Sequence, residues 1–299
     1  MDPLRLVLAL CVVALHTGFP EGAPDPVRQV LVNGIYRIAV PVFAVISGCF
    51  FPGAIRAGRA GAYIRRILSL YALWMLIYLP VWGRDVASAG HAAQVVLFGY
   101  FHLWFLPGLV LSAVLMLGLT RLRAPAGAVA ALAVACAGIG LAGQYLAMTG
   151  RAIPLDAYRN GLFVIFPYFA AGCLIAAGRD RIAPGLAAVG LCLLAVAAES
   201  LIWFRIAGGG FGVDNMVALL VAAPVLFLAA LHLRLRIDGK RIASMAAFVY
   251  FVHVLVMIAA SSLGLAGDAK AVFVMASCLA LAWVLDRAAG GRRVLGALT

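Results

Sequence analysis

Long apolar segments separated by short, arginine-containing linkers run through the whole of this 299-residue chain. A bilayer core about 30 Å thick needs roughly 20 residues of helix. Ten segments approach that length: 4–20, 34–52, 67–82, 98–120, 126–147, 161–177, 184–202, 215–232, 244–262 and 271–286. The pattern predicts an all-α, polytopic transmembrane helix bundle of about ten spans, in which the first and seventh segments are short for a span.

Composition supports a membrane protein and excludes several other classes. Apolar residues make up 66% of the chain and charged residues 11%, whereas soluble domains carry about 25% charged residues. The surplus apolar surface therefore faces lipid. Because no polar stretch is long enough for a soluble domain, we expect one integral-membrane domain over residues 1–299. The six cysteines fall in apolar segments without CxxC spacing, so neither a metal site nor a disulfide framework is predicted. No cleaved signal peptide is expected.

The net charge of +12 reflects membrane orientation. Alternate linkers, starting with the first, hold 16 of the 23 basic residues: Arg5, Arg56, Arg59, Arg65, Arg66, Arg121, Arg123, Arg179, Arg181, Arg234, Arg236, Lys240, Arg241, Arg287, Arg292 and Arg293. Cytoplasmic loops carry such an excess, so we expect both termini in the cytoplasm. Anionic lipid headgroups, and not nucleic acid, are the expected partner of this charge. The preference for Arg over Lys, with abundant Ala and Gly, suggests a GC-rich bacterial genome. The expected location of this multi-pass protein is the bacterial cytoplasmic (inner) membrane.

Ionisable residues inside spans are costly, and each is a functional candidate. His16 lies 12 residues into the first segment, which places it about 18 Å deep. Arg5 lies 11 residues earlier, three helical turns away and within about 20° of the same helix face. This face offers a guanidinium at the cytoplasmic mouth and an imidazole deep inside. The alternative is an interfacial Arg and an ordinary core His.

Three other ionisable residues in or near the apolar segments are candidate functional residues. His253 lies at a similar depth in the ninth segment. His102 opens the fourth segment beside Trp104, and both could belong to an interfacial aromatic belt. Glu199 lies near the end of the seventh segment, where pairing with Arg205 at the interface explains it better than catalysis does.

The linker between the second and third segments holds four arginines, of which Arg65 and Arg66 lead into the third segment. Arginine forms bidentate contacts with phosphate, so these residues are candidates for binding a phosphorylated substrate. The positive-inside signal alone is the other explanation.

Several motifs together are similar to one family. They are Arg5 with His16, the stretch Val40–Gly48 ending in Ser47-Gly48, the arginine-rich entry to the third span, His102-Leu103-Trp104-Phe105-Leu106-Pro107, and Tyr250 with His253. In this order and spacing the chain resembles the acyltransferase-3 family of bacterial integral-membrane O-acyltransferases, in a minimal stand-alone form. It departs from the family pattern in three places: Cys49 replaces an aromatic residue, Ala246 replaces a serine, and Arg65 and Arg66 are adjacent.

The resemblance implies transfer of an acyl group, acetyl in the first instance, from cytoplasmic acyl-CoA to a hydroxyl of a carbohydrate or lipid-linked glycan. His16 would be the general base, acting with Arg5, and Arg65 and Arg66 would bind the donor phosphates. His102 and Trp104 would bind the acceptor in the outer half of the bundle. Ser47, Tyr250, His253 and Glu199 are supporting candidates. No metal or bound cofactor is expected. An acylated His16 intermediate fits the sequence equally well, and a small transporter or flippase of a polar or anionic solute is the alternative function.

Overall fold

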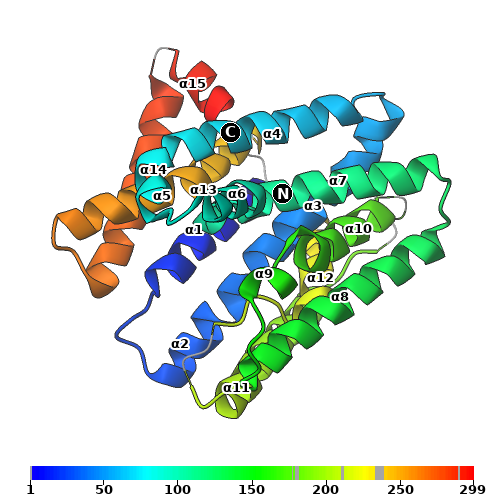
Figure 1. Cartoon of the computed structure of the whole chain (residues 1–299), viewed down its shortest axis with the longest axis horizontal. Helices are drawn as coiled ribbons and strands as arrows, with labels where there is room; N and C mark the ends of the chain where they lie inside the picture. The colour runs from blue at the N-terminus through cyan, green and yellow to red at the C-terminus, as the bar shows by residue number, and fades with distance from the viewer. Residues whose placement is uncertain (1, 177, 179–181, 210–211, 233–238, 289) are drawn as a thin grey trace. The chain divides into compact units, whose positions relative to one another are not determined.

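The computed structural model describes residues 2–176, 178, 182–209, 212–232, 239–288 and 290–299 (Figure 1). Helices joined by short turns make up these residues, and no strand occurs among them. Four arginines of the charge count, Arg179, Arg181, Arg234 and Arg236, lie outside the described residues, as do the side chains of Lys240 and Arg292. The predicted all-α fold is confirmed for the described part of the chain.

Each of the ten apolar segments corresponds to a helix. These are α1 (Asp2–Thr17), α3 (Ala39–Arg56), α4 (Ala60–Ile77), α7 (Phe105–Arg121), α8 (Ala126–Met148), α10 (Phe166–Ile175), α11 (Leu186–Ile206), α12 (Val217–His232), α13 (Gly239–Ser262) and α14 (Gly267–Arg287). Within the described residues, eight helical stretches are long and apolar enough to cross a membrane. The chain is therefore a multi-pass membrane protein, while ten spans with cytoplasmic termini stay a prediction.

The lengths of two helices differ from expectation. The seventh segment, expected to be short, forms the 21-residue helix α11. The eighth segment forms α12, which has 16 described residues and belongs with α1 to the shorter apolar helices.

Shorter helices, which the hydrophobic pattern does not predict, lie between these ten helices or after the last of them. They are α2 (Asp25–Val32), α5 (Leu79–Asp85), α6 (Ala89–Phe98), α9 (Leu155–Tyr158) and α15 (Gly291–Leu298), with the 3₁₀ helices η1 (Ile35–Ile38) and η2 (Phe101–Trp104) and the π-helix η3 (Gly161–Ile165). Local chemistry starts several of them. Ser88, for example, caps α6 by accepting a hydrogen bond from the His91 backbone N–H at 3.1 Å.

The contacts divide the chain into two compact units. Unit 1 comprises Met1–Ala39, Pro184–Val213 and Ala229–Thr299, and unit 2 comprises Val40–Ala183 and Asp214–Leu228. In unit 1, α1 packs along α13, both helices contact α14, and α15 packs on α13 and α14 (Figure 1). Helix α2 and η1 pack on α11 in the same unit. The single domain predicted for residues 1–299 stays a prediction.

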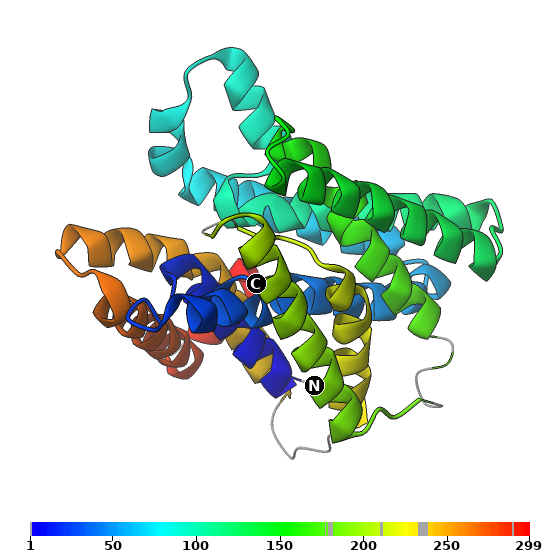
Figure 2. The ribbon, with the colours of Figure 1, turned by 90° about the horizontal axis from the view of Figure 1, so that it is seen from below.

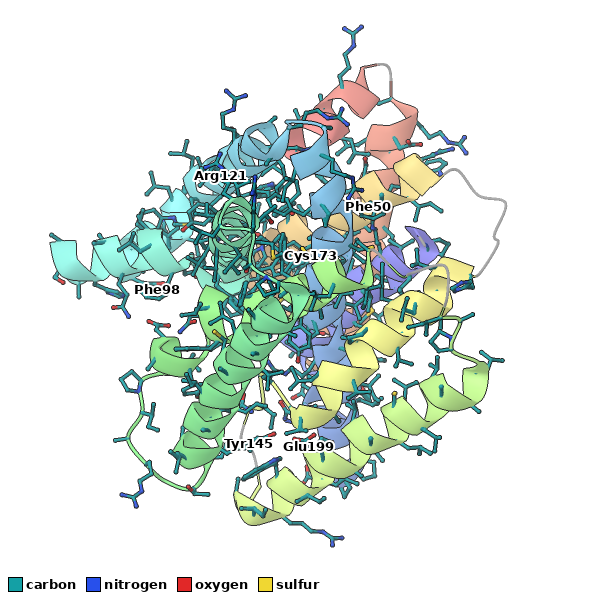
Figure 3. The ribbon with its side chains drawn as sticks, turned by 90° about the vertical axis from the view of Figure 1, so that its right-hand side faces the viewer. Phe50, Phe98, Arg121, Tyr145, Cys173 and Glu199 are labelled. Atoms are coloured by element: carbon teal, nitrogen blue, oxygen red, sulfur yellow. The ribbon has the colours of Figure 1, made fainter. Side chains whose placement is uncertain are left out.

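Unit 2 is built around α7, which contacts α4, α10 and η3, while α8 packs against α10 and η3. Helices α3 and α10 approach closely through glycines. A methyl group at Gly48 would overlap the Phe169 backbone, and one at Gly172 would overlap the backbone of Val45. The thiol of Cys173, labelled in Figure 3, donates to the Gly48 carbonyl at 3.1 Å. Small residues at this crossing let the two helices pack backbone to backbone.

Helices α5 and α6 form an arch, cyan to teal in Figure 2. The Tyr71 hydroxyl of α4 donates to the Val96 carbonyl of α6 at 2.6 Å. The Gln94 amide of α6 donates to the Asp156 carboxylate of α9 at 2.5 Å. Among the described residues, these two side-chain hydrogen bonds attach α6 to the rest of unit 2.

Candidate active site

His16 lies in the last turn of α1, and a glycine directly after the helix terminates it. Gly18 has a φ of +71°, and the Phe19 backbone N–H donates to the Ala14 carbonyl at 2.9 Å. This left-handed glycine cap stops the helix at Thr17. The cap places the half-buried His16 imidazole at the C-terminal end of a short helix.

The structure brings His16 together with His253, two candidates that are far apart in the sequence. Their rings stack with centroids 5.3 Å apart and an interplanar angle of 19°. His253 is fully buried in α13, and its Nδ1 lies 2.7 Å from the Tyr250 carbonyl oxygen. Since a carbonyl only accepts, Nδ1 carries the proton of this bond and Nε2 is the basic nitrogen of the neutral ring. Tyr250 thereby fixes the orientation of His253 one turn away, with its own ring 6.2 Å from the imidazole.

Electrostatics constrains the charge on this histidine pair. Two imidazolium rings 5.3 Å apart would repel each other by about 3 kcal/mol at an effective dielectric constant of 20. The stacked arrangement therefore accommodates a single positive charge better than two. One accessible ring on one buried, oriented ring is an arrangement that can accept and return a proton.

Arg5 lies near the opposite end of α1, where its side chain is half-buried. Helix α1 is continuous from Asp2 to Thr17, so Arg5 and His16 share a face with about 16 Å of helical rise between them. Glu199, also in unit 1, is half-buried in the C-terminal half of α11. Arg5 and His16 thus mark the two ends of one helix face.

The candidate donor residues lie in unit 2. Arg65 and Arg66 are exposed in the second turn of α4. Ser47 is half-buried on α3 and shares a side-chain hydrogen bond with Tyr63 of α4. Ser47 therefore joins α3 to α4, directly beside the glycine at which α3 packs on α10.

Two further arginines flank the turn between α3 and α4. Arg56 ends α3, and Arg59 is the N-cap residue of α4. Gly58, with a φ of +68°, allows the Arg59 backbone N–H to donate to the Ala54 carbonyl at 2.8 Å. Both arginine side chains are exposed, so this turn and the start of α4 present four exposed guanidinium groups.

The two candidate acceptor residues, His102 and Trp104, have different surroundings in the structure. His102 is only 2% exposed in η2, where its ring meets Tyr78 edge-on at 5.3 Å and Phe101 at 6.2 Å. It is a packed interior residue of unit 2 and not part of an interfacial belt. Trp104 is half-buried, and the Arg159 guanidinium lies 5.4 Å from the centroid of its indole ring.

Trp104 lines a cavity of about 400 Å³ in unit 2. The end of α6, the start of α7 and the segment from α9 to η3 form its walls, and Asp156, Arg159 and Asn160 supply polar groups. The hydropathy pattern does not single out these three residues, because they lie in a linker between two apolar segments. The signal was present: a cluster of polar side chains directly precedes the apolar segment that begins at Gly161.

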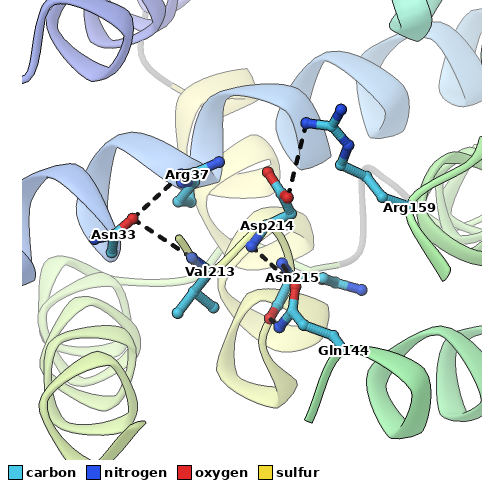
Figure 4. A network of polar contacts seen from close by, with 7 residues as sticks. All are labelled: Asn33, Arg37, Gln144, Arg159, Val213, Asp214 and Asn215. Carbon is cyan, nitrogen blue, oxygen red and sulfur yellow. Dashed lines mark hydrogen bonds and ion pairs between the residues drawn. The ribbon is translucent and has the colours of Figure 1, made fainter. Parts of the chain in front are cut away.

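A buried polar network in unit 2 was also missed (Figure 4). The Gln144 side-chain oxygen accepts from the backbone N–H groups of Asp214 and Asn215, each at 2.9 Å, and its amide nitrogen donates to the Asn215 carbonyl. The Tyr168 hydroxyl donates to the Asn215 side-chain oxygen at 2.5 Å. These bonds hold the chain that enters α12. A single amide within an apolar segment was the available signal.

Unit 1 has its own polar network at the start of the chain (Figure 4). The Asn33 side-chain oxygen accepts from Arg37 at 3.2 Å and from the Val213 backbone N–H at 3.4 Å. The Asn33 amide donates to Gln29, whose own amide donates to the Ser200 carbonyl at 3.2 Å. The network fastens α2 to α11.

Comparisons with known proteins give relatives and a family. No solved structure matches the chain. A serine/alanine racemase of Enterococcus gallinarum is 30% identical over 135 residues, which are 40% of this chain and 19% of that protein. An amino-acid racemase of Enterococcus faecalis is 26% identical over 122 residues, 38% of this chain and 17% of that protein. The chain thus spans less than a fifth of the length of the curated relatives it matches.

The family match covers far more of the chain than these relatives do. The acyltransferase domain of the acyltransferase-3 family matches residues 1–287. That range includes the histidine pair, the arginines of α4 and the cavity beside Trp104. The chain belongs to the acyltransferase-3 family.

Proposed function

We propose that this protein is a bacterial inner-membrane O-acyltransferase. It moves an acyl group, acetyl in the first instance, from acyl-CoA on the cytoplasmic side to a hydroxyl of a carbohydrate or lipid-linked glycan. Family membership supports acyl transfer in general. The observation that carries the mechanism is the stack of His16 on the buried, oriented ring of His253.

In the proposed reaction, His16 is the general base. A sugar hydroxyl is a poor nucleophile at neutral pH, and imidazole, with an unperturbed pKa of about 6.5, can remove its proton as the oxygen attacks. The new bond joins that oxygen to the thioester carbonyl carbon, and the carbon–sulfur bond breaks. The proton passes from His16 to the departing thiolate. The products are the O-acyl ester and free CoA, so atoms and charge balance.

The arginines are proposed to bind the donor and to take no part in proton transfer. Arg5 lies on the His16 face of α1, and Arg65 and Arg66 are exposed on α4. The guanidinium group matches phosphate geometry and stays charged at all working pH values, which suits the nucleotide phosphates of CoA. Acyl-CoA is then a co-substrate, and no resident cofactor is needed.

The alternative chemistry, with an acylated His16 intermediate, makes a separate prediction. A covalent acyl-enzyme can form before the acceptor binds, so the protein would exchange labelled CoA into acyl-CoA in the absence of acceptor. Direct transfer gives no such exchange. Isotope exchange with the purified protein therefore decides between the two routes.

The test of the proposed function is labelled-acyl transfer by the purified full chain in detergent micelles. Micelles enclose no compartments, so product formation cannot be mistaken for transport by a carrier. His16→Ala is expected to lower the turnover rate by about 10²–10⁴-fold, the usual contribution of a general base. If His16→Ala keeps more than a few per cent of the wild-type rate, His16 is not the base.

Two control variants make the test specific. Thr17 is the next residue on α1, and within the described residues its hydroxyl bonds only to carbonyls of its own helix turn, at 2.9 and 3.2 Å. Thr17→Ala should therefore keep near wild-type activity. His91 is exposed at the start of α6, so His91→Ala tests the loss of a histidine elsewhere. If neither the wild type nor the two control variants use any acyl-CoA donor, while vesicles containing the wild type accumulate a polar solute, the transporter alternative replaces this proposal.

A further inference from the structure

The cavity beside Trp104 combines apolar area with several polar groups. Its volume of about 400 Å³ falls within the usual range for small-molecule sites, roughly 300–1,000 Å³. Trp104, Phe98 and Pro107 supply apolar area, while Asp156, Arg159 and Asn160 supply hydrogen-bonding groups. Figure 3 labels Phe98 at the end of α6.

The walls of the cavity are closely built. Gly99 has a φ of +89°, and a methyl group there would lie 2.7 Å from the Trp104 backbone. Gly108 and Gly161 meet across the contact of α7 with η3, where a Cβ on Gly161 would lie 2.6 Å from the Gly108 Cα. The Asn160 side chain accepts from two backbone N–H groups at 3.0 Å and so fixes the start of the π-helix. π-Helical turns occur frequently at functional sites.

The polar groups around the cavity have defined partners. The Arg159 guanidinium lies over the Trp104 ring, and one of its nitrogens is 3.8 Å from the Asp214 carboxylate. Its Nε–H is buried and meets no acceptor within the described residues. Asp156 accepts from the neutral amide of Gln94, a bond that leaves the carboxylate charge in place.

These groups predict the charge of the ligand. Arg159 and Asp214 neutralise each other as an ion pair, whereas Asp156 adds a negative charge to the wall. A second anion would meet this carboxylate in a half-buried setting, where like charges repel strongly. Neutral hydroxyl groups suit the wall better, because each can donate to Asp156 and accept from Arg159.

We propose that this cavity is the acceptor site and that it holds a neutral, hydroxylated sugar ring. The indole of Trp104 packs against the apolar C–H groups of the ring, Asp156 accepts from its hydroxyls, and Arg159 donates to them. The site selects neutral rings over acidic ones through the charge of Asp156. This inference rests on the proposed acyl transfer, since it names the acceptor class of that reaction.

The test measures binding and not transfer. Saturation-transfer NMR on the full chain in detergent uses the methyl pyranosides of glucose, galactose and mannose, each paired with its uronic acid. We expect the affinity for at least one neutral glycoside to be about tenfold or more above the affinity for its uronate. Binding of that glycoside should weaken about tenfold in Trp104→Ala, through lost ring contact.

Asp156→Asn keeps the size of the side chain and removes its charge. It provides an independent test if the Trp104→Ala variant does not fold. It should bring the matching uronate to within about threefold of the neutral sugar. Asp85→Asn, an exposed acid of α5 that does not line the cavity, is the matched control and should keep the wild-type preference. The inference is overturned if no neutral glycoside binds, if uronates bind better, or if Asp156→Asn leaves the preference unchanged.

The outcome separates this inference from the proposed function. A protein that acylates an acceptor but shows none of these binding effects would refute the cavity assignment and leave acyl transfer intact. A protein that shows the binding pattern but transfers no acyl group from any donor would refute the proposed reaction and keep the sugar site.

Discussion

Gly161→Ala should damage the contact between α7 and η3. The new methyl carbon would lie 2.6 Å from the Gly108 Cα and 3.3 Å from the Gly108 carbonyl oxygen. Carbon atoms pack at about 3.5–4.0 Å, so α7 and η3 would have to separate by roughly 1 Å. Overpacking of this kind typically costs about 1–3 kcal/mol, which lowers an apparent Tm by roughly 2–10 °C. Thermal unfolding of the purified chain in detergent measures the shift.

Gly138→Ala is the matched control. Gly138 is exposed in the middle of α8, and a methyl group there would meet no atom within 4 Å. Alanine in a helix is more favourable than glycine by about 0.5–1 kcal/mol, so this variant should melt at the wild-type temperature or slightly above it. Equal shifts for the two variants, or no shift for Gly161→Ala, would refute the close contact between α7 and η3.

Three further predictions concern the site and its supports. His253→Ala should lower kcat about tenfold or more while KM for acyl-CoA changes less than about threefold, because His253 positions His16 and does not bind the donor; a KM effect of equal size would contradict this. Arg65→Ala and Arg66→Ala should each raise KM for acyl-CoA roughly ten- to a hundredfold, with no effect on a truncated donor that lacks the nucleotide phosphates. Asp286, 3% exposed, pairs with the partly exposed Arg241. Asp286→Ala should therefore lower the free energy of unfolding by about 1–3 kcal/mol, measured by thermal unfolding. An unchanged Tm would show that the ion pair is dispensable for stability.

Hydropathy located the long apolar helices but not their ends. The first segment was predicted to reach residue 20, yet α1 ends at Thr17 because Gly18 caps it in a left-handed conformation. The seventh segment was predicted to end at residue 202, yet α11 continues through Trp203 to Ile206. Helix ends depend on capping bonds and on individual backbone angles, which an average over apolar residues does not detect. The short helices α5 and α9 were not predicted for the same reason.

For the candidate site too, features within one helix could be predicted from the sequence, whereas contacts between helices could not. That Arg5 and His16 share a face follows from the helical period, because both lie on one continuous helix. That His16 stacks on His253 depends on which helices pack together, and no periodicity in the sequence encodes the pairing of α1 with α13. Arg159 shows a third limit: a guanidinium in a loop has the same sequence signature whether it sets topology or lines a cavity.

The composition of unit 1 has a consequence for biosynthesis. Helix α1 leaves the ribosome well before its packing partner α13, which ends at Ser262. At about 5–20 residues per second, the ribosome needs roughly 12–50 s to make the chain from the end of α1 to the end of α13. Throughout that interval the face of α1 that α13 will cover has no partner within its own unit. An mRNA truncated before the codons for α13 would therefore yield an inserted chain in which α1 keeps its histidine but lacks the surface that orients it.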